Sequence, residues 1–283
     1  MRLQTDTSQE NLTTADFDRL RALIHTTAGI SLSAEKKTML EIRLRRRLRS
    51  LSFDSFSEYC RYVFSAATRD QELIHLIDAV TTNKTDFFRE PDHFDYLATK
   101  ALPALTAQNG ASKVLAWSAG CSTGEEPYTL AIVLSEYAQT RPGFHFTLLA
   151  TDIDTTVLDK ARLGIFKKET VRPVSPALQK KYLMRSRDPG SDRVRIVPEL
   201  RAKIEFRRLN FMEGDYGLAE PPQIIFCRNV IIYFDRQTQG RILQKLVRHL
   251  APGGYFFAGH SESLQNMGLP LAAVGPAVYR KVA

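Results

Sequence analysis

The sequence lacks any apolar segment long enough to cross a bilayer. None of the apolar runs in its 283 residues approaches a membrane-spanning helix, which needs roughly 20 residues. The opening stretch, MRLQTDTSQENLTTADF, is polar and has no apolar signal core. We therefore expect a soluble protein that stays in the cytoplasm.

Cysteine is scarce as well. The chain has 3 cysteines, Cys60, Cys121 and Cys227, which are odd in number and widely spaced. A disulfide framework requires an even set, and a zinc site requires closely spaced ligands. We predict neither a disulfide framework nor a metal site, but buried or neutral thiols in a reducing compartment.

Acidic residues are outnumbered, with 31 Asp+Glu against 39 Lys+Arg and a net charge of +8. Such a balance favours an anionic partner: a nucleic acid, a membrane surface or an acidic protein. The positive charge is dense in LEIRLRRRLRSL at 40–51, where leucines recur at helical spacing. If the leucines are buried, the opposite face and its flanks carry Arg43, Arg45, Arg46, Arg47 and Arg49. No aromatic residues interleave with these arginines, which disfavours single-stranded nucleic acid.

The pattern of the chain changes along its length. Residues 1–80 show helical periodicity and no strong strand pattern, and residues 81–110 connect this part to the rest. From 111 to 283, short apolar runs alternate with helical stretches, which predicts a Rossmann-like α/β fold: a mostly parallel sheet with helices on both faces. The expected strands are 113–117, 144–150, 204–209, 222–227, 254–259 and a terminal one. Residues 167–202 break the alternation and predict a small β-hairpin subdomain.

The first expected strand runs into a turn that contains Gly120 and Gly124. Glycines between a strand and a helix allow a ligand to approach the backbone closely. The spacing is not that of a dinucleotide fold, and no Gly-Lys-Ser/Thr follows. The acidic pair Glu125–Glu126 would repel a pyrophosphate and suits a cationic ligand such as S-adenosylmethionine. A purely structural turn is the alternative.

Polar residues also follow two other expected strands. Asp152 comes directly off the second strand, where an acid can accept hydrogen bonds from ribose hydroxyls, and Asp154 suits a helix N-cap. Arg228 and Asn229 interrupt the apolar run at 226–234. Since ligands bind at the carboxyl edge of such sheets, we expect a ligand site here, with a buried structural pair as the alternative.

These residues belong to longer strings with a specific resemblance. WSAGCSTGEEPYTLA, ATDID, IFCRNVIIYFD and FAGHSESL, with TNKTDFFRE upstream, resemble in this order the chemotaxis receptor methyltransferase family, CheR. The likeness covers nearly the whole chain. It implies a class I methyltransferase sheet preceded by an all-α domain. It also implies methyl transfer from S-adenosylmethionine to receptor glutamates, giving methyl esters and S-adenosylhomocysteine in chemosensory adaptation.

The resemblance also implies roles for residues at matching positions. The cofactor-binding set is Asn83, Thr85, Arg89, Glu126 (or its neighbour Glu125), Asp152, Asn210, Phe211, Arg228 and Asn229. Arg89 and Tyr233 are the expected catalytic residues, acting by positioning, because an ionised glutamate needs no general base. His260 is accordingly expected to be structural. The linker 81–110 is expected to contribute to the cofactor site.

The partner implied by the resemblance is the cytoplasmic helical bundle of a chemoreceptor. Its acidic face would meet the basic helix, so Arg43, Arg45, Arg46 and Arg49 are the candidate substrate-binding residues. In some members the β-subdomain also docks a C-terminal receptor tether by strand addition. Those members carry a glycine-bracketed loop where this chain has Ser186-Arg187-Asp188, which leaves tether binding open. We expect a monomer.

Two other functions fit the same fold, because a fold does not determine a substrate. One is an RNA or small-molecule methyltransferase, which a steeply salt-dependent affinity for RNA would indicate. The other is a non-catalytic module that senses the cofactor, which binding without turnover would indicate.

Overall fold

The computed structural model describes residues 11–109, 113–264 and 267–282. The chain divides into two compact units, Met1–Thr82 and Asn83–Ala283. No helix in these ranges is both long and apolar enough to span a bilayer.

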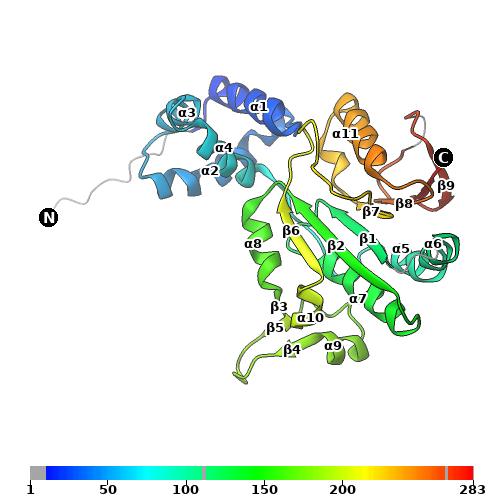
Figure 1. Ribbon diagram of the computed structural model, residues 1–283. Coiled ribbons are helices and arrows are strands. Elements are labelled where there is room, and N and C mark those ends of the chain that lie inside the picture. Colours follow the sequence, from blue (N-terminus) through cyan, green and yellow to red (C-terminus); the bar gives the residue numbers. More distant parts are fainter. Residues whose placement is uncertain (1–10, 110–112, 265–266, 283) are drawn as a thin grey trace. The chain divides into compact units, whose positions relative to one another are not determined.

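The first unit is helical, as the sequence predicts (Figure 1). Its helices are α1 (Thr14–Ala28), α2 (Lys37–Leu51), α3 (Phe56–Phe64) and α4 (Arg69–Val80), with a 3₁₀ turn η1 (Ala34–Lys36). Local signals set their ends: Thr13 caps α1 through its side chain, and Gly29 ends that helix with a φ of 73°. Ser55 and Glu58 form a capping box at the start of α3.

A buried carboxylate ties α2, α3 and α4 together. Glu72 is 1% exposed, and its oxygens accept from Arg47 Nε and Nη2 at 2.9 and 2.6 Å and from the Tyr59 hydroxyl at 3.0 Å. This bidentate geometry is the strong form of a charge-assisted pair. Arg47 is therefore an internal residue of the first unit.

The other arginines of α2 differ in their surroundings. Arg43 donates to the carbonyl oxygens of Val80 and Thr81 at 3.0 and 2.7 Å, at the C-terminal end of α4. A cation there offsets the partial negative charge of the helix end. Arg45 pairs with Glu41 at 2.5 Å. Of the four candidate substrate-binding arginines, Arg46 and Arg49 are exposed, whereas Arg43 and Arg45 are partly buried.

The second unit is built on a seven-stranded sheet (Figure 1). Its strands are β1 (Lys113–Ala119), β2 (His145–Asp152), β6 (Ile204–Arg208), β7 (Ile224–Cys227), β8 (Tyr255–Ala258), β9 (Leu271–Gly275) and β10 (Val278–Lys281). They lie in the order β6-β2-β1-β7-β8-β10-β9. The first five are parallel, and β10 runs antiparallel to both neighbours. The sequence predicted one terminal strand, whereas the structure has a hairpin of two.

Helices cover both faces of this sheet, which confirms the predicted Rossmann-like class. On one side in Figure 1 lie α5 (Pro91–Tyr96), the π-helical η2 (Leu97–Ala101), α6 (Leu102–Asn109), α7 (Glu125–Gln139) and α8 (Thr155–Leu163). On the other side lies α11 (Arg236–His249). Successive residues of a strand face opposite sides of the sheet. In β1, the alternate residues Val114 and Ala116 belong to the apolar core beneath α5–α8.

The predicted β-subdomain is present and contains one strand more than a hairpin. β4 (Leu183–Arg185) and β5 (Arg193–Ile196) pair antiparallel, and β3 (Ile165–Lys167) adds to the other side of β5. Two short helices, α9 (Pro176–Tyr182) and α10 (Pro198–Arg201), complete it.

Candidate cofactor site

The turn after β1 packs against the turn after β7. Gly120 has a φ of 90°, and a Cβ there would lie 2.4 Å from Val230 Cγ2, so a side chain would collide as well as strain the backbone. The amides of Gly120 and Cys121 both donate to the Thr151 carbonyl at 2.8 and 2.9 Å. The ends of β1, β2 and β7 are thus held close together, as ligand sites at a carboxyl edge require.

Asp152 lies at this edge with both carboxylate oxygens held. Oδ2 accepts from the Ser122 amide at 2.8 Å and Oδ1 from the Asp154 amide at 3.0 Å. Burial raises the pKa of Asp152 to about 6, although these amide hydrogen bonds act in the opposite direction. Each oxygen retains a second lone pair, so the side chain can still accept from ribose hydroxyls.

Asp154 caps α8, as the sequence predicts, and also anchors the start of the second unit. Its side chain accepts from the amides of Thr156 and Val157, and its Oδ2 accepts from Asn83 Nδ2 at 2.7 Å. The Asn83 carbonyl accepts in turn from Ser122 Oγ at 3.0 Å. Asn83 is therefore fixed beside the turns after β1 and β2.

Arg228 lies between two carboxylates. Its side chain is 2% exposed, with Nη1 at 3.5 Å from Glu126 Oε2 and Nη2 at 3.2 Å from Glu90 Oε2. Nη2 also donates to the Arg89 carbonyl, and Glu126 accepts from Ser118 Oγ at 2.7 Å. Arg228 forms ion pairs with both acids, so its positive charge is compensated within the protein.

The two acids differ in their electrostatics. Burial raises the pKa of Glu126 above its ordinary value, against the opposing effect of Arg228. Burial also acts to raise the pKa of Glu90, but Arg228 and the His260 amide outweigh it, and the pKa is lowered. Glu90 is thus the more firmly ionised partner of Arg228. Glu90 ends the motif TNKTDFFRE, but it was not among the predicted site residues.

Asn229 has the geometry of a ligand-binding residue. Its backbone is in the left-handed region, with a φ of 58°, which asparagine adopts more readily than most non-glycine residues. Its side-chain Oδ1 is buried and has no hydrogen-bond partner within the described parts of the chain. A buried acceptor of this kind calls for a donor.

Glu262 holds the backbone on which Asn229 sits. Its carboxylate, 6% exposed, accepts four amides: Val230 and Ile231 on Oε1 at 2.8 Å, and Asn229 and Gly259 on Oε2 at 2.8 and 2.7 Å. Glu262 was not among the predicted site residues. The available signal was a lone acid in FAGHSESL, just after an apolar strand.

Among the described residues, the side chains of the other predicted positions make no hydrogen bond or ion pair with this network. Arg89 Nη1 donates to the Lys84 carbonyl at 3.0 Å. Phe211 follows β6, is 8% exposed, and packs edge-on near Phe234, with ring centroids 6.5 Å apart. Asn210 directly precedes Phe211, and its Oδ1 accepts from the Met212 amide at 3.0 Å. Tyr233 is partly buried at the end of η3 (Ile231–Tyr233). Thr85 is partly buried in the segment between Asn83 and Arg89.

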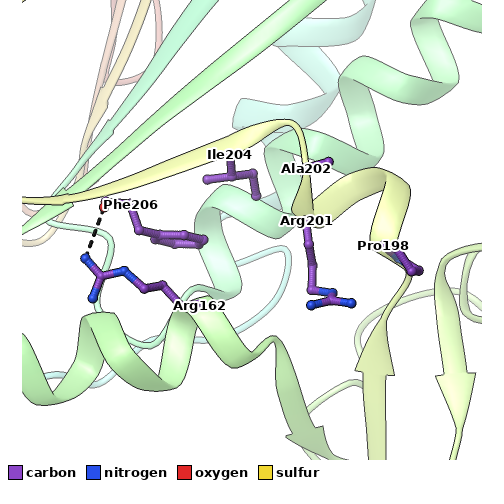
Figure 2. Close-up of a pocket in the computed structure, with 6 residues that line it drawn as sticks. All are labelled: Arg162, Pro198, Arg201, Ala202, Ile204 and Phe206. Atoms are coloured by element: carbon purple, nitrogen blue, oxygen red, sulfur yellow. Dashed lines mark hydrogen bonds between the residues drawn. The ribbon is translucent and has the colours of Figure 1, made fainter.

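An open pocket lies elsewhere, beside the start of β6 (Figure 2). Ile204 and Phe206 form its apolar wall, and Arg162, which donates to the Phe206 carbonyl at 3.1 Å, lies at its rim with Arg201. None of the predicted cofactor-binding or catalytic residues lines it. The start of β6 is the end of the sheet opposite to Asp152.

The residues at the carboxyl edge fit S-adenosylmethionine. The sulfonium and ammonium groups of this molecule suit an acidic edge with an unpaired acceptor, which Asn229 Oδ1 provides. Asp152 offers lone pairs to hydroxyls, and Phe211 offers an aromatic surface next to it in the sheet order. Arg228 is the one buried lysine or arginine in the ranges that the structure describes, and its charge is already paired, so it is not available for a pyrophosphate.

Comparisons with known proteins identify a cofactor-binding domain and a helical domain in the chain. Residues 83–275 match the model of the CheR methyltransferase, SAM binding domain, and residues 15–81 match that of the CheR methyltransferase, all-alpha domain. The chain is 42% identical to a chemotaxis protein methyltransferase of Salmonella typhimurium, over 95% of this chain and 90% of that protein. It is 40% identical to chemotaxis protein methyltransferase 2 of Pseudomonas aeruginosa, over 94% and 93%.

A third relative, the chemotaxis protein methyltransferase of Borreliella burgdorferi, is 38% identical over 275 residues, 96% of this chain and 95% of that protein. These matches confirm the resemblance that the sequence motifs indicated. The chain belongs to the CheR methyltransferase family.

Proposed function

We propose that this chain transfers methyl groups from S-adenosylmethionine to glutamate side chains of bacterial chemoreceptors, leaving glutamyl methyl esters and S-adenosylhomocysteine. The observation that carries the cofactor half of the proposal is the unpaired, buried Oδ1 of Asn229 beside the acidic edge. The substrate half rests on the relatives, which are named chemotaxis protein methyltransferases and align over nearly the whole chain. We accordingly propose that the protein acts in the cytoplasm, on the cytoplasmic domains of its receptors.

The cofactor supplies an electrophilic methyl group on a sulfonium. A glutamate carboxylate has an ordinary pKa of about 4.3 and is ionised at neutral pH, so it attacks without a general base. What the chain must do is align the reacting groups and exclude water, which can contribute about 7–11 kcal/mol. We propose that Arg89 and Tyr233 perform this positioning. No proton transfer is assigned to either residue.

The proposed cofactor contacts follow from the geometry of the edge. We propose that Asp152 accepts from the ribose, that Asn210 and Phe211 flank the adenine, and that Asn229 Oδ1 accepts from the ammonium group. Arg228 acts indirectly, by holding Glu126 and the Arg89 backbone in place. The complete proposed set also includes Asn83, Thr85, Arg89 and Glu126, with the linker 81–110 supplying the first three.

We propose that the helical part, residues 1–80, faces the receptor and that residues 111–283 carry the methyltransferase fold. Arg46 and Arg49 are exposed on α2 and suit an acidic surface. Arg43 and Arg45 contribute less directly, because they are held by α4 carbonyls and by Glu41. Tether binding at the β-subdomain, residues 167–202, and a monomeric state remain predictions.

The test uses methyl-labelled S-adenosylmethionine and membranes that carry chemoreceptors, followed by mild base. Release of volatile methanol identifies a glutamyl methyl ester, and Arg89→Ala should abolish it. Arg141→Ala is the matched control, because Arg141 is an exposed arginine that precedes β2 at the far end of the sheet. Base-stable label on RNA or a small molecule would show that the substrate is not a receptor glutamate. Cofactor binding without any transferred label would indicate a sensing module.

A further inference from the structure

Three potential metal ligands converge beside the Arg228 network. Glu90, His93 and His260 each offer a ligand atom, and these atoms all lie within 4.8 Å of one another. Glu90 precedes α5, His93 lies in α5, and His260 follows β8, so the fold brings together two segments that are 170 residues apart in sequence. The cysteine spacing alone had predicted no metal site, and these three residues lie outside that pattern.

His93 is the informative member. It is 1% exposed, and its Nε2 lies 3.3 Å from the Pro276 carbonyl oxygen. A carbonyl can only accept, so this contact requires the proton on Nε2. In the neutral ring, the other nitrogen, Nδ1, carries a lone pair. Holding a ring nitrogen through a backbone carbonyl is how proteins orient a histidine toward a metal.

The lone pair of His93 Nδ1 points at another acceptor. Nδ1 lies 3.4 Å from Glu90 Oε2, yet it has no hydrogen-bond partner in the residues that the structure describes. Two acceptors that face each other in a buried place are unfavourable unless a cation lies between them. Arg228 donates to Glu90 and to the Arg89 carbonyl, not to His93.

We propose that Glu90, His93 and His260 bind a divalent transition-metal ion of the zinc class, with the fourth position open to water. Two imidazoles and a carboxylate are a ligand set that Zn²⁺, Co²⁺ and Ni²⁺ accept. Metal–ligand distances are about 2.0–2.2 Å in such sites, so the three ligand atoms must approach one another more closely. His260 can make that movement, because it is exposed and lies in a turn.

The position of the site gives the ion a defined effect. Glu90 Oε2 is shared with Arg228 Nη2 at 3.2 Å, and two cations on one carboxylate repel each other. Metal binding therefore has moderate strength, and it loosens Arg228 from Glu90. This inference concerns the metal site alone and does not depend on the identity of the methyl acceptor.

The test is a titration of the metal-free full chain with Co²⁺, whose visible absorbance reports its coordination, followed by competition with Zn²⁺. We expect one saturable ion per chain and at least a tenfold weaker Kd in His260→Ala. His145→Ala is the control, because His145 is an exposed histidine of the same unit at the start of β2, and it should bind as the wild type does. His260→Ala is compatible with folding because the side chain is exposed, and circular dichroism checks this.

Three results would overturn the proposal. They are an absence of saturable binding, an unchanged Kd in His260→Ala, and an equal loss of affinity in His260→Ala and His145→Ala. A second variant, His93→Gln, tests the buried ligand. If it folds and still binds Co²⁺ with the wild-type spectrum, His93 is not a ligand and the site is rejected.

Discussion

Replacement of Glu262 by glutamine tests how the cofactor edge is held. The change keeps the shape of the side chain but replaces one carboxylate oxygen by an NH₂ group, which cannot accept a hydrogen bond. Two of the four amides that Glu262 binds would then face a donor. A hydrogen bond to a charged group contributes about 1.5–3 kcal/mol, so two lost bonds amount to about 3–6 kcal/mol.

We expect Glu262→Gln to lower the free energy of unfolding of the second unit by about 3 kcal/mol, the low end of that range because the turn can partly relax. It should also weaken S-adenosylhomocysteine binding, because the backbone of Asn229 is no longer fixed at its φ of 58°. Urea unfolding is followed by the fluorescence of Trp117, the 1 tryptophan of the chain, which is buried in β1. Calorimetry gives the cofactor Kd.

Glu205→Gln is the matched control, since Glu205 is an exposed acid in β6 and should change neither quantity. An unfolding free energy of Glu262→Gln within about 0.5 kcal/mol of wild type, the range of ordinary surface changes, would refute the hydrogen-bond reasoning. A destabilised variant that binds the cofactor with unchanged Kd would refute the link between this carboxylate and the site.

Three further perturbations follow from other contacts. Asp152→Asn should flatten the pH dependence of stability. In the wild type, the folded pKa of about 6 lies above the unfolded value of about 3.9, so the stabilisation present below about pH 4 is lost as the pH rises to about 6. Urea unfolding of wild type and variant at both ends of this window measures the difference. Arg47→Ala should lower the free energy of unfolding of the first unit by about 3–5 kcal/mol, measured by helical circular dichroism, because Glu72 would stay buried without its cation. Glu72→Gln in the same background should restore part of that loss, and an absence of restoration would contradict the assigned ion pair. Arg46→Ala with Arg49→Ala should raise the KM for receptor several-fold at low salt with kcat unchanged, and the difference should vanish at high ionic strength; an equal fall in kcat would argue against a docking role.

Signals within a few residues of one another made much of the fold predictable. The Thr13 cap, the Gly29 stop and the Asp154 cap depend only on their own helices, and the strand–helix alternation fixed the class. These features need no knowledge of what lies across the molecule. The hairpin at the end was only half predicted, although Gly275-Pro276 is a turn signal just before the reversal at Ala277, whose φ is 52°.

The contacts that organise the site could not be predicted, since they join distant segments. Glu90 and Arg228 are 138 residues apart in sequence, and Glu262 binds amides more than 30 residues before it. An isolated acid gives no sign of which amides it will accept. Helical periodicity likewise placed Arg43 on a flank of the basic face, but could not show that carbonyls of α4 would hold it.

The contact between Gly120 and Val230 has a consequence for how the cofactor edge moves. The space that a Cβ of Gly120 would need is filled by the Val230 side chain, so neither turn can shift far without displacing the other. Amide protons in the two turns should therefore be released to solvent by the same opening event and exchange with deuterium at a common rate, although they belong to different strands. The two turns then form one cooperative unit, and ligand binding at either should slow exchange in both.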